Sequence, residues 1–422
     1  MRCRAKQVAV GVTVTLCAAV APPTAENAAG SVPGPRAKGV AAVCADAASA
    51  FALTEGMYGA NRPIVERLRA DTRWVSATDP RTQLGLDAER LAKAAKFVDG
   101  YPTSRSLLVA RDGDVLWEKY FHGGAAEQSL NVHSASKSIM QGLLSIALRD
   151  RAAGYPAGLK TPLAKIISNP SLDQRTTLES LVRMSSGLAW KELGEEGVSA
   201  ETADDYRDWK DRTDWVAEMI RIGADPDAKP GPTVPGSTMV YSSANTHLVS
   251  AAIARMTGRS TCEYAQEKLF SPLGITPEAW FKDPGGVYSG GFNMHLTARE
   301  LARFGQLYLK GGKIDPADPV GIVPAEAVAN APIRWDGSDA LPPADPEEYD
   351  YGNGWWRTRV KVKGRPVTSY FADGYGGQSS MVLPALKLSV TVTQSTVQPY
   401  GDDEDNAVFL NKLLQLVIAA VR

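Results

Sequence analysis

Ser134-Ala135-Ser136-Lys137 is the stretch from which the rest of this chain is interpreted. It opens a helix-like run, Ser138 to Leu148, and side chains three residues apart on a helix share one face. Backbone N–H groups at the first turn of a helix also point outward without partners. The stretch therefore offers a nucleophilic hydroxyl, an amine that could act as a base, and half of an oxyanion-binding site. The alternative interpretation is a Ser cap followed by a solvated Lys.

The partner that takes the proton of a nucleophilic Ser is usually a His. The chain has only four His in 422 residues, and it contains no G-x-S-x-G elbow. It also lacks HExxH, P-loop and CxxC motifs, so we expect neither a metal nor a cofactor. A Ser–Lys pair remains, in which a phenol could relay the proton. Tyr241 is the candidate phenol, because it follows the Pro235-Gly236 turn and precedes a predicted helix over 243–257; the alternative is a core aromatic.

A glycine-rich stretch, Gly374-Tyr375-Gly376-Gly377-Gln378, directly precedes a predicted strand. Consecutive glycines allow another backbone or a ligand to approach closely. A backbone N–H from this stretch could complete an oxyanion hole with the N–H of Ser134. The alternative is an ordinary glycine-rich turn.

Taken together, these pieces resemble the class C β-lactamase-like superfamily of serine hydrolases. That group includes DD-peptidases, EstB-type esterases and 6-aminohexanoate-dimer hydrolases. The similarity extends over roughly residues 100 to 420 and is carried by five stretches: 132–138, 181–188, 235–246, 296–305 and 374–378.

The resemblance implies a role for each candidate residue. Ser134 would attack a carbonyl carbon and form an acyl-enzyme, while Lys137 and Tyr241 would share the general-base and general-acid work. Contacts to the oxyanion or the substrate would come from Tyr375, Gly377 and Ser243.

Two departures from the family pattern bear on the substrate. The second motif is Tyr-x-Ser, whereas β-lactamases and many DD-peptidases have Tyr-x-Asn; a Tyr-x-Asn at Tyr351-Gly352-Asn353 is interpreted as structural. The third motif has no Lys or His to bind a substrate carboxylate. We therefore expect an amidase or esterase similar to 6-aminohexanoate-dimer hydrolases, acting on a small-molecule or short peptide-like substrate. The alternatives are a DD-carboxypeptidase, a β-lactamase, or a non-catalytic relative that binds cell-wall peptides.

Predicted strands lie near both ends of the chain and predicted helices lie between them. This order indicates an α/β (α+β) fold in which both chain ends build one antiparallel sheet flanked by helices around an inserted, mostly helical region. The resemblance implies that this fold is like that of β-lactamases and DD-peptidases. The predicted sheet region covers 45–135 and 330–422, the helical region covers 136–329, and the active site lies at their interface. The elements expected are a helix after Asp87, a hairpin over 106–121, a helix over 178–184 with its capping box at Thr176 and Glu179, helices over 243–257, 297–309 and 406–421, and strands over 355–362, 366–371, 379–383 and 388–393.

The first residues read as a secretory signal, 1–25, followed by a disordered leader, 26–44. Three basic residues precede an apolar run, Val8 to Ala21, which is short for a membrane span. We therefore expect a secreted or extracytoplasmic protein, without a lipid anchor on Cys17 because the preceding Leu16 is bulky. After signal removal, Cys44 and Cys262 could form a disulfide or remain two buried thiols.

The overall composition is that of a globular protein, with 44% hydrophobic and 22% charged residues and a formal charge of −1. Nothing in it favours nucleic-acid binding. The last apolar helix contains Asn411, Lys412 and Gln415, so we expect it to pack inside the protein and no stable membrane span. An acidic stretch, 190–215, is interpreted as a surface loop with a short helix; the alternative is a lid over the site.

Overall fold

The computed structural model describes Cys44 and residues 75–111, 115–150, 158–190, 213–227, 231–337, 349–395 and 403–422. The predicted signal, nearly all of the predicted leader, most of the acidic stretch and the turn at Asp112-Gly113 lie outside these residues. In the described part of the chain, no helix is both long and apolar enough to cross a bilayer.

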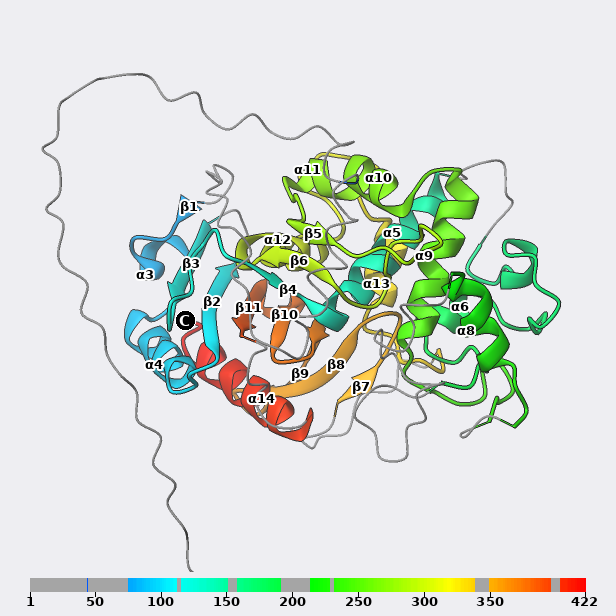
Figure 1. Cartoon of the computed structure of the whole chain (residues 1–422). Coiled ribbons are helices and arrows are strands. Elements are labelled where there is room, and N and C mark those ends of the chain that lie inside the picture. The colour runs from blue at the N-terminus through cyan, green and yellow to red at the C-terminus, as the bar shows by residue number, and fades with distance from the viewer. Residues whose placement is uncertain are drawn as a thin grey trace, which may run out of the picture. The chain divides into compact units, whose positions relative to one another are not determined.

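A large sheet joins the two ends of the described chain (Figure 1). Its strand order is β1-β3-β2-β11-β10-β9-β8-β7, and neighbouring strands run antiparallel except β1 and β3. The central pairing sets β11 beside β2, with Val390 opposite Val109, so segments almost 300 residues apart are neighbours. The predicted fold class is confirmed. The strands are β1 Val75–Ser76, β2 Ser104–Arg111, β3 Val115–Tyr120, β7 Asp350–Tyr351, β8 Trp356–Val362, β9 Arg365–Gly374, β10 Gln378–Leu383 and β11 Leu388–Gln394.

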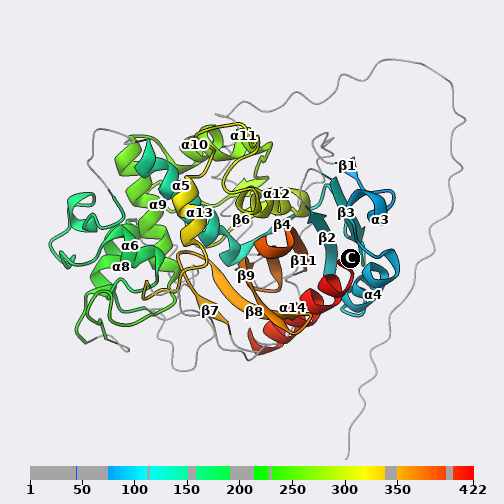
Figure 2. The ribbon, with the colours of Figure 1, turned by 180° about the vertical axis from the view of Figure 1, so that it is seen from behind.

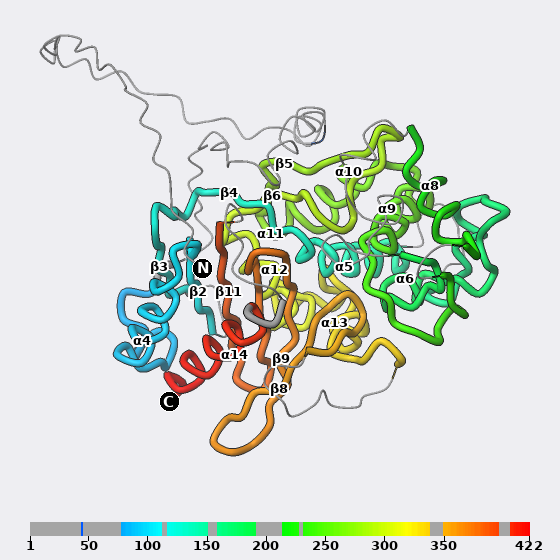
Figure 3. The backbone as a smooth tube through the Cα atoms, turned by 60° about the horizontal axis from the view of Figure 1, so that its bottom comes forward, coloured from blue at the N-terminus to red at the C-terminus, as the bar shows by residue number. Residues whose placement is uncertain are grey.

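Helices cover both faces of this sheet because its strands alternate side chains between two apolar layers. Leu107 and Val109 pack with residues of α4 (Ala88–Asp99) and α14 (Asp403–Ala419) on one face. Leu108 and Ala110 pack with residues of α12 (Ala298–Leu309) on the other. Figure 2 shows α14 crossing near β8, and Figure 3 shows it beside α4.

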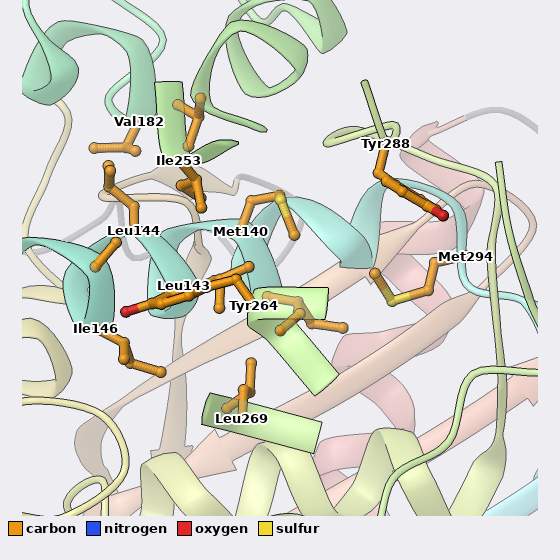
Figure 4. Packing of buried hydrophobic residues seen from close by; sticks show 14 of the residues in the cluster. Met140, Leu143, Leu144, Ile146, Val182, Ile253, Tyr264, Leu269, Tyr288 and Met294 are labelled. Carbon is orange, nitrogen blue, oxygen red and sulfur yellow. The ribbon is translucent and has the colours of Figure 1, made fainter. Parts of the chain in front are cut away.

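The remaining helices enclose a second apolar core, built around α5 and α9 (Figure 4). A small sheet that the sequence analysis did not predict, β4-β6-β5, lies at the edge of this region. Its strands are β4 Ser129–Asn131, β5 Ala279–Trp280 and β6 Met294–Thr297. The further helices are α3 Pro80–Gln83, α5 Ser136–Arg149, α6 Leu178–Val182, α8 Trp215–Gly223, α9 Ser243–Thr257, α10 Thr261–Ala265, α11 Ser271–Leu273 and α13 Ala325–Asn330; the 3-10 turns are η2 His133–Ala135, η4 Leu163–Lys165 and η6 Pro384–Leu386, and η5 Gln266–Phe270 is a π-helical turn.

Local signals explain where several helices begin and end. Asp87 accepts hydrogen bonds from two N–H groups of the first turn of α4, and Gly258 ends α9 in the left-handed conformation (φ +65°). The capping box of α6 differs from the prediction by one residue: it is formed by Thr177 and Ser180, not by Thr176 and Glu179. The Thr176 hydroxyl instead donates to the carbonyl oxygen of Ser186.

Cys44 and Cys262 form a disulfide, with their Cα atoms 5.8 Å apart. The sequence left open whether these two cysteines form a disulfide or remain thiols, and in the structure they form the disulfide. The carbonyl oxygen of Cys44 also accepts a hydrogen bond from the hydroxyl of Tyr288. The disulfide therefore ties Cys44 to Cys262 near the start of α10, and the Tyr288 hydrogen bond holds it against the loop that follows β5.

Candidate active site

The Ser134 hydroxyl and the Lys137 amine are in direct contact. Ser134 lies in η2, immediately before α5, and its side chain is partly exposed. Lys137 is in the first turn of α5 and is only 1% exposed. Its Nζ donates to Ser134 Oγ at 2.9 Å. The pair thus combines a hydroxyl that a substrate can reach with a base candidate shielded from water.

Two further acceptors hold the Lys137 amine from other elements. Nζ donates to Ser243 Oγ (2.9 Å), at the start of α9, and to the carbonyl oxygen of Gly291 (3.2 Å), in the loop between β5 and β6. Nζ also lies 4.7 Å from the centre of the Tyr241 ring. The amine is therefore the point where α5, α9 and this loop meet.

Tyr241 is positioned by the start of α9 and by aromatic neighbours. Ser242 caps the helix by accepting a hydrogen bond from the N–H of Asn245. The Tyr241 ring packs against Tyr351 in an edge-to-face arrangement (5.6 Å) and against Trp356 (5.2 Å). Tyr351, which the sequence analysis treated as structural, thus contacts a candidate catalytic residue.

The end of β9 approaches the Ser134 turn through Gly374. A Cβ added to Gly374 would lie 2.1 Å from the carbonyl oxygen of Val132 and 3.1 Å from the Ala135 nitrogen. No side chain fits there, which explains why glycine occupies this position. The next residue, Tyr375, is 47% exposed, and its ring meets the ring of His133 edge-on at 5.7 Å.

Gly377 completes the turn between β9 and β10. It has a positive φ of 84°, and its N–H donates to the carbonyl oxygen of Gly374 at 3.1 Å. Tyr375 and Gly377 are the two residues expected to supply the second N–H of the oxyanion site. Of these, Gly377 donates its N–H within the turn. Tyr375 directly follows the glycine that contacts the Ser134 turn.

His133, the residue before Ser134, is buried in a strained conformation. Its φ is +45°, which is uncommon for a residue with a side chain, and its N–H donates to Asn131 Oδ1. Burial, the largest cause, together with the nearby His295 ring and Lys137 amine, lowers the pKa of His133 to about 3. Burial also lowers the pKa of His295 to about 4. Both imidazoles are accordingly neutral at pH 7.

The structure brings together four candidate residues from the sequence: Ser134, Lys137, Tyr241 and Ser243. Tyr375 and Gly377 lie in the adjoining turn. The sequence analysis missed the carbonyl of Gly291. The signal in the sequence was the consecutive pair Gly290-Gly291, because two adjacent glycines allow another group to approach the backbone closely. The same reasoning was applied to Gly376-Gly377. Within the residues described above, no three His, Cys, Asp or Glu side chains are grouped so as to hold a metal.

Comparisons with known proteins identify the family of this chain. The model of the Beta-lactamase family matches residues 95–415. No curated protein matches the chain. Among solved structures, a provisionally named 6-aminohexanoate-dimer hydrolase from Bacillus anthracis is similar over 85% of this chain and 89% of its own, at 18% identity and a TM-score of 0.58.

Two other solved structures share the fold. A provisionally named β-lactamase from Bacteroides dorei DSM 17855 has a TM-score of 0.60 at 16% identity, covering 79% of this chain and 99% of its own. The D-amino acid amidase from Ochrobactrum anthropi SV3 has a TM-score of 0.56 at 14% identity, covering 79% and 100%. The family match spans most of the chain and includes the Ser134–Lys137 pair. The chain therefore belongs to the Beta-lactamase family and is a serine hydrolase.

Proposed function

We propose that the protein hydrolyses amide or ester bonds of small-molecule or short peptide-like substrates through an acyl-enzyme on Ser134. The observation that carries the proposal is the 2.9 Å contact between Lys137 Nζ and Ser134 Oγ, made by an amine that is almost fully buried. A buried amine beside an accessible hydroxyl is the arrangement that activates a Ser nucleophile without His.

The hydrogen-bond partners of Lys137 orient the lone pair of its amine. A neutral amine has two hydrogens and one lone pair, and a carbonyl oxygen can only accept. When Lys137 is neutral, Gly291 takes one hydrogen and Ser243 Oγ can take the other, so the lone pair faces the Ser134 hydroxyl. Lys137 then receives the Ser134 proton as Oγ attacks the substrate carbonyl carbon.

Collapse of the tetrahedral intermediate breaks the amide or ester bond. The proton returns from Lys137 or Tyr241 to the leaving amine or alcohol, and the acyl group stays on Ser134 Oγ. Water then attacks the acyl carbon and gives a proton to the same groups; the bond between the acyl carbon and Ser134 Oγ breaks, Oγ takes the proton back, and the carboxylic acid product leaves. In both steps the oxyanion would be held by the N–H groups of Ser134 and Tyr375. Tyr375 is the better second donor because the Gly377 N–H is engaged by Gly374.

The third motif supports a substrate without an essential carboxylate. Gly374 and Tyr375 occupy the positions where a cation would bind such a group, and neither carries a charge. The structural neighbours named as a 6-aminohexanoate-dimer hydrolase and a D-amino acid amidase support an amidase or esterase. A DD-carboxypeptidase or β-lactamase is the second candidate, on the basis of the family match.

A substrate panel separates these candidates. It contains a p-nitrophenyl ester, an aminohexanoate dimer, a D-Ala-D-Ala peptide and a chromogenic cephalosporin. We expect ester hydrolysis and poor or no cephalosporin turnover. Fast cephalosporin turnover would show that the argument from the uncharged third motif is wrong.

A fluorophosphonate probe tests the catalytic assignment itself. The probe should label Ser134, and Ser134→Ala should lose both label and turnover. Lys137→Ala should label far more slowly than the unaltered protein. Labelling at another residue, or normal function in Lys137→Ala, would favour the non-catalytic, peptide-binding alternative.

We also propose that the protein works outside the cytoplasm. The predicted signal, 1–25, and the Cys44–Cys262 disulfide both support an oxidising compartment. Expression of the full gene followed by cell fractionation and sequencing of the mature N-terminus tests this. A full-length chain that stays in the cytoplasm would contradict it.

A further inference from the structure

A buried His–Asp pair lies behind the Lys137 amine and has no part in the chemistry described so far. His247 Nε2 is 3.0 Å from Asp283 Oδ2, and both side chains are almost completely buried. His247 lies on α9, one helical turn after Ser243. Asp283 lies in the loop between β5 and β6 that also contains Gly291. The pair therefore joins the two elements that hold the lysine amine.

The Asp283 carboxylate shapes its loop as well as bonding to α9. Its other oxygen, Oδ1, accepts a hydrogen bond from the N–H of Val287 at 2.7 Å. The N–H of Asp283 in turn donates to the carbonyl oxygen of Val287. The carboxylate thus closes the turn 283–287 while its second oxygen faces His247. Trp215 lies beside the pair, with ring-centre distances of 6.0 Å to His247 and 5.5 Å to Phe281. Trp215, the first residue of α8, thus packs on His247 of α9 and on Phe281, two residues before Asp283.

Beyond this turn, the loop continues along α9 in fixed register. A Cβ on Gly290 would lie 1.9 Å from the carbonyl oxygen of Thr246, the residue before His247. A Cβ on Gly291 would lie 2.9 Å from Thr246 Oγ1 and 3.2 Å from the Ser243 side chain. Asp283 therefore faces His247, Gly290 faces Thr246, and Gly291 faces both Thr246 and Ser243. The carbonyl oxygen of Gly291, at the end of this row of contacts, accepts a hydrogen bond from Lys137 Nζ.

We propose that His247 and Asp283 are positioning residues for Lys137. Their hydrogen bond fixes the loop on α9, and this sets the Gly291 carbonyl and the Ser243 hydroxyl at the positions that direct the amine toward Ser134. The proposal rests on the proposed function, since it requires Lys137 to act as the base. Because neither residue contacts Ser134 or the oxyanion site, the expected effect is on the rate of acylation and not on substrate affinity.

Two amide substitutions test the proposal with little change in polarity. The Gln side chain can place its Nε2 near the position of His247 Nε2, whereas Asn is one methylene shorter and cannot reach Asp283. We expect His247→Asn to lower the maximal rate of fluorophosphonate labelling at Ser134 by about 10- to 100-fold, with unchanged probe affinity, since a displacement near 1 Å can cost about 100-fold. His247→Gln should recover most of the rate.

Ser250→Ala is the matched control. Ser250 lies on the same helix and is fully buried, and its hydroxyl donates to Thr261 of α10. Its removal loosens α9 against α10 while leaving the His247–Asp283 hydrogen bond in place. It should label at the unaltered rate. Thermal unfolding of all three variants corrects the rates for the folded fraction.

The outcomes separate the two proposals. If Ser134 in the unaltered protein is not labelled, the proposed function fails. If the unaltered protein is labelled and Lys137→Ala is slow, but His247→Asn labels as fast as His247→Gln, only the positioning role is overturned. Equal losses in His247→Asn and Ser250→Ala would also overturn it, because they would reflect the loosening of α9 alone.

Discussion

Gly374→Ala should slow acylation strongly while leaving the protein folded. The new methyl group would lie 2.1 Å from the Val132 carbonyl oxygen, whereas ordinary contacts begin near 3.4 Å. The end of β9 must therefore move away from the Ser134 turn by about 1.3 Å, and a misplacement of this size near the reacting groups costs about 100-fold. The backbone φ of Gly374 is not positive, so the effect comes from the contact and not from backbone strain.

The assay is the pre-steady-state release of p-nitrophenol from a p-nitrophenyl ester, which measures acylation directly. We expect a loss of about 100-fold in the acylation rate, alongside a destabilisation of about 1–3 kcal/mol from overpacking. Gly158→Ala is the control, because Gly158 is exposed and an added Cβ would contact nothing within 4 Å. A folded Gly374→Ala protein that acylates at the unaltered rate would refute the claim that β9 forms part of the oxyanion site.

Two further predictions concern stability. Reducing the Cys44–Cys262 bridge should lower the free energy of unfolding by about 5 kcal/mol, because the bridge closes a loop with a sequence separation of 218 and so restricts the unfolded chain. Urea denaturation with and without reductant measures this difference. Identical midpoints would contradict the prediction. Neutral, buried His133 should destabilise the protein in acid, because the unfolded chain binds its proton at about pH 6.5 and the folded chain only near pH 3. The contribution of His133 to the free energy of unfolding is fully present above pH 6.5 and is lost as the pH decreases toward 3. The loss between pH 7 and pH 4 is about 3 kcal/mol. His133→Asn, which tolerates the positive φ, should unfold with a correspondingly flatter pH dependence, and an unchanged dependence would count against the assignment.

Much of the fold was predictable because its signals are local. The cap at Asp87, the stop at Gly258 and the continuous apolar run 107–110 of β2 each act within a few positions of the element they define. The helices α4, α9 and α14 and the strands β2, β3 and β8 to β11 lie where the sequence indicated, with ends that differ by a few residues.

What the sequence did not indicate depends on contacts between distant segments. The strands β4, β5 and β6 are two to four residues long, too short to show a pattern, and exist because Leu130 and Ala279 find partners in β6. The capping box of α6 was displaced by one residue because Thr177 and Ser180 compete with Thr176 and Glu179 for the same role.

The same limit applies to the site. Ser134 and Lys137 are close in sequence, so their contact follows from helical geometry. The position of Tyr241 before a predicted helix only suggested a candidate phenol, and the family resemblance was needed to favour it and to add Ser243, since α9 reaches α5 by tertiary packing. Gly291 and the His247–Asp283 pair became visible only when α9 and the β5–β6 loop were placed together.

Trapping the acyl-enzyme tests the central claim most directly. The full chain is mixed with an activated ester, quenched in acid during the burst, digested and examined by mass spectrometry. We predict an acyl group on the peptide at Ser134, its absence in Ser134→Ala, and a much smaller amount in Lys137→Ala at the same quench time. Continued ester turnover with no adduct at Ser134, or equal adduct in Lys137→Ala, would contradict the account.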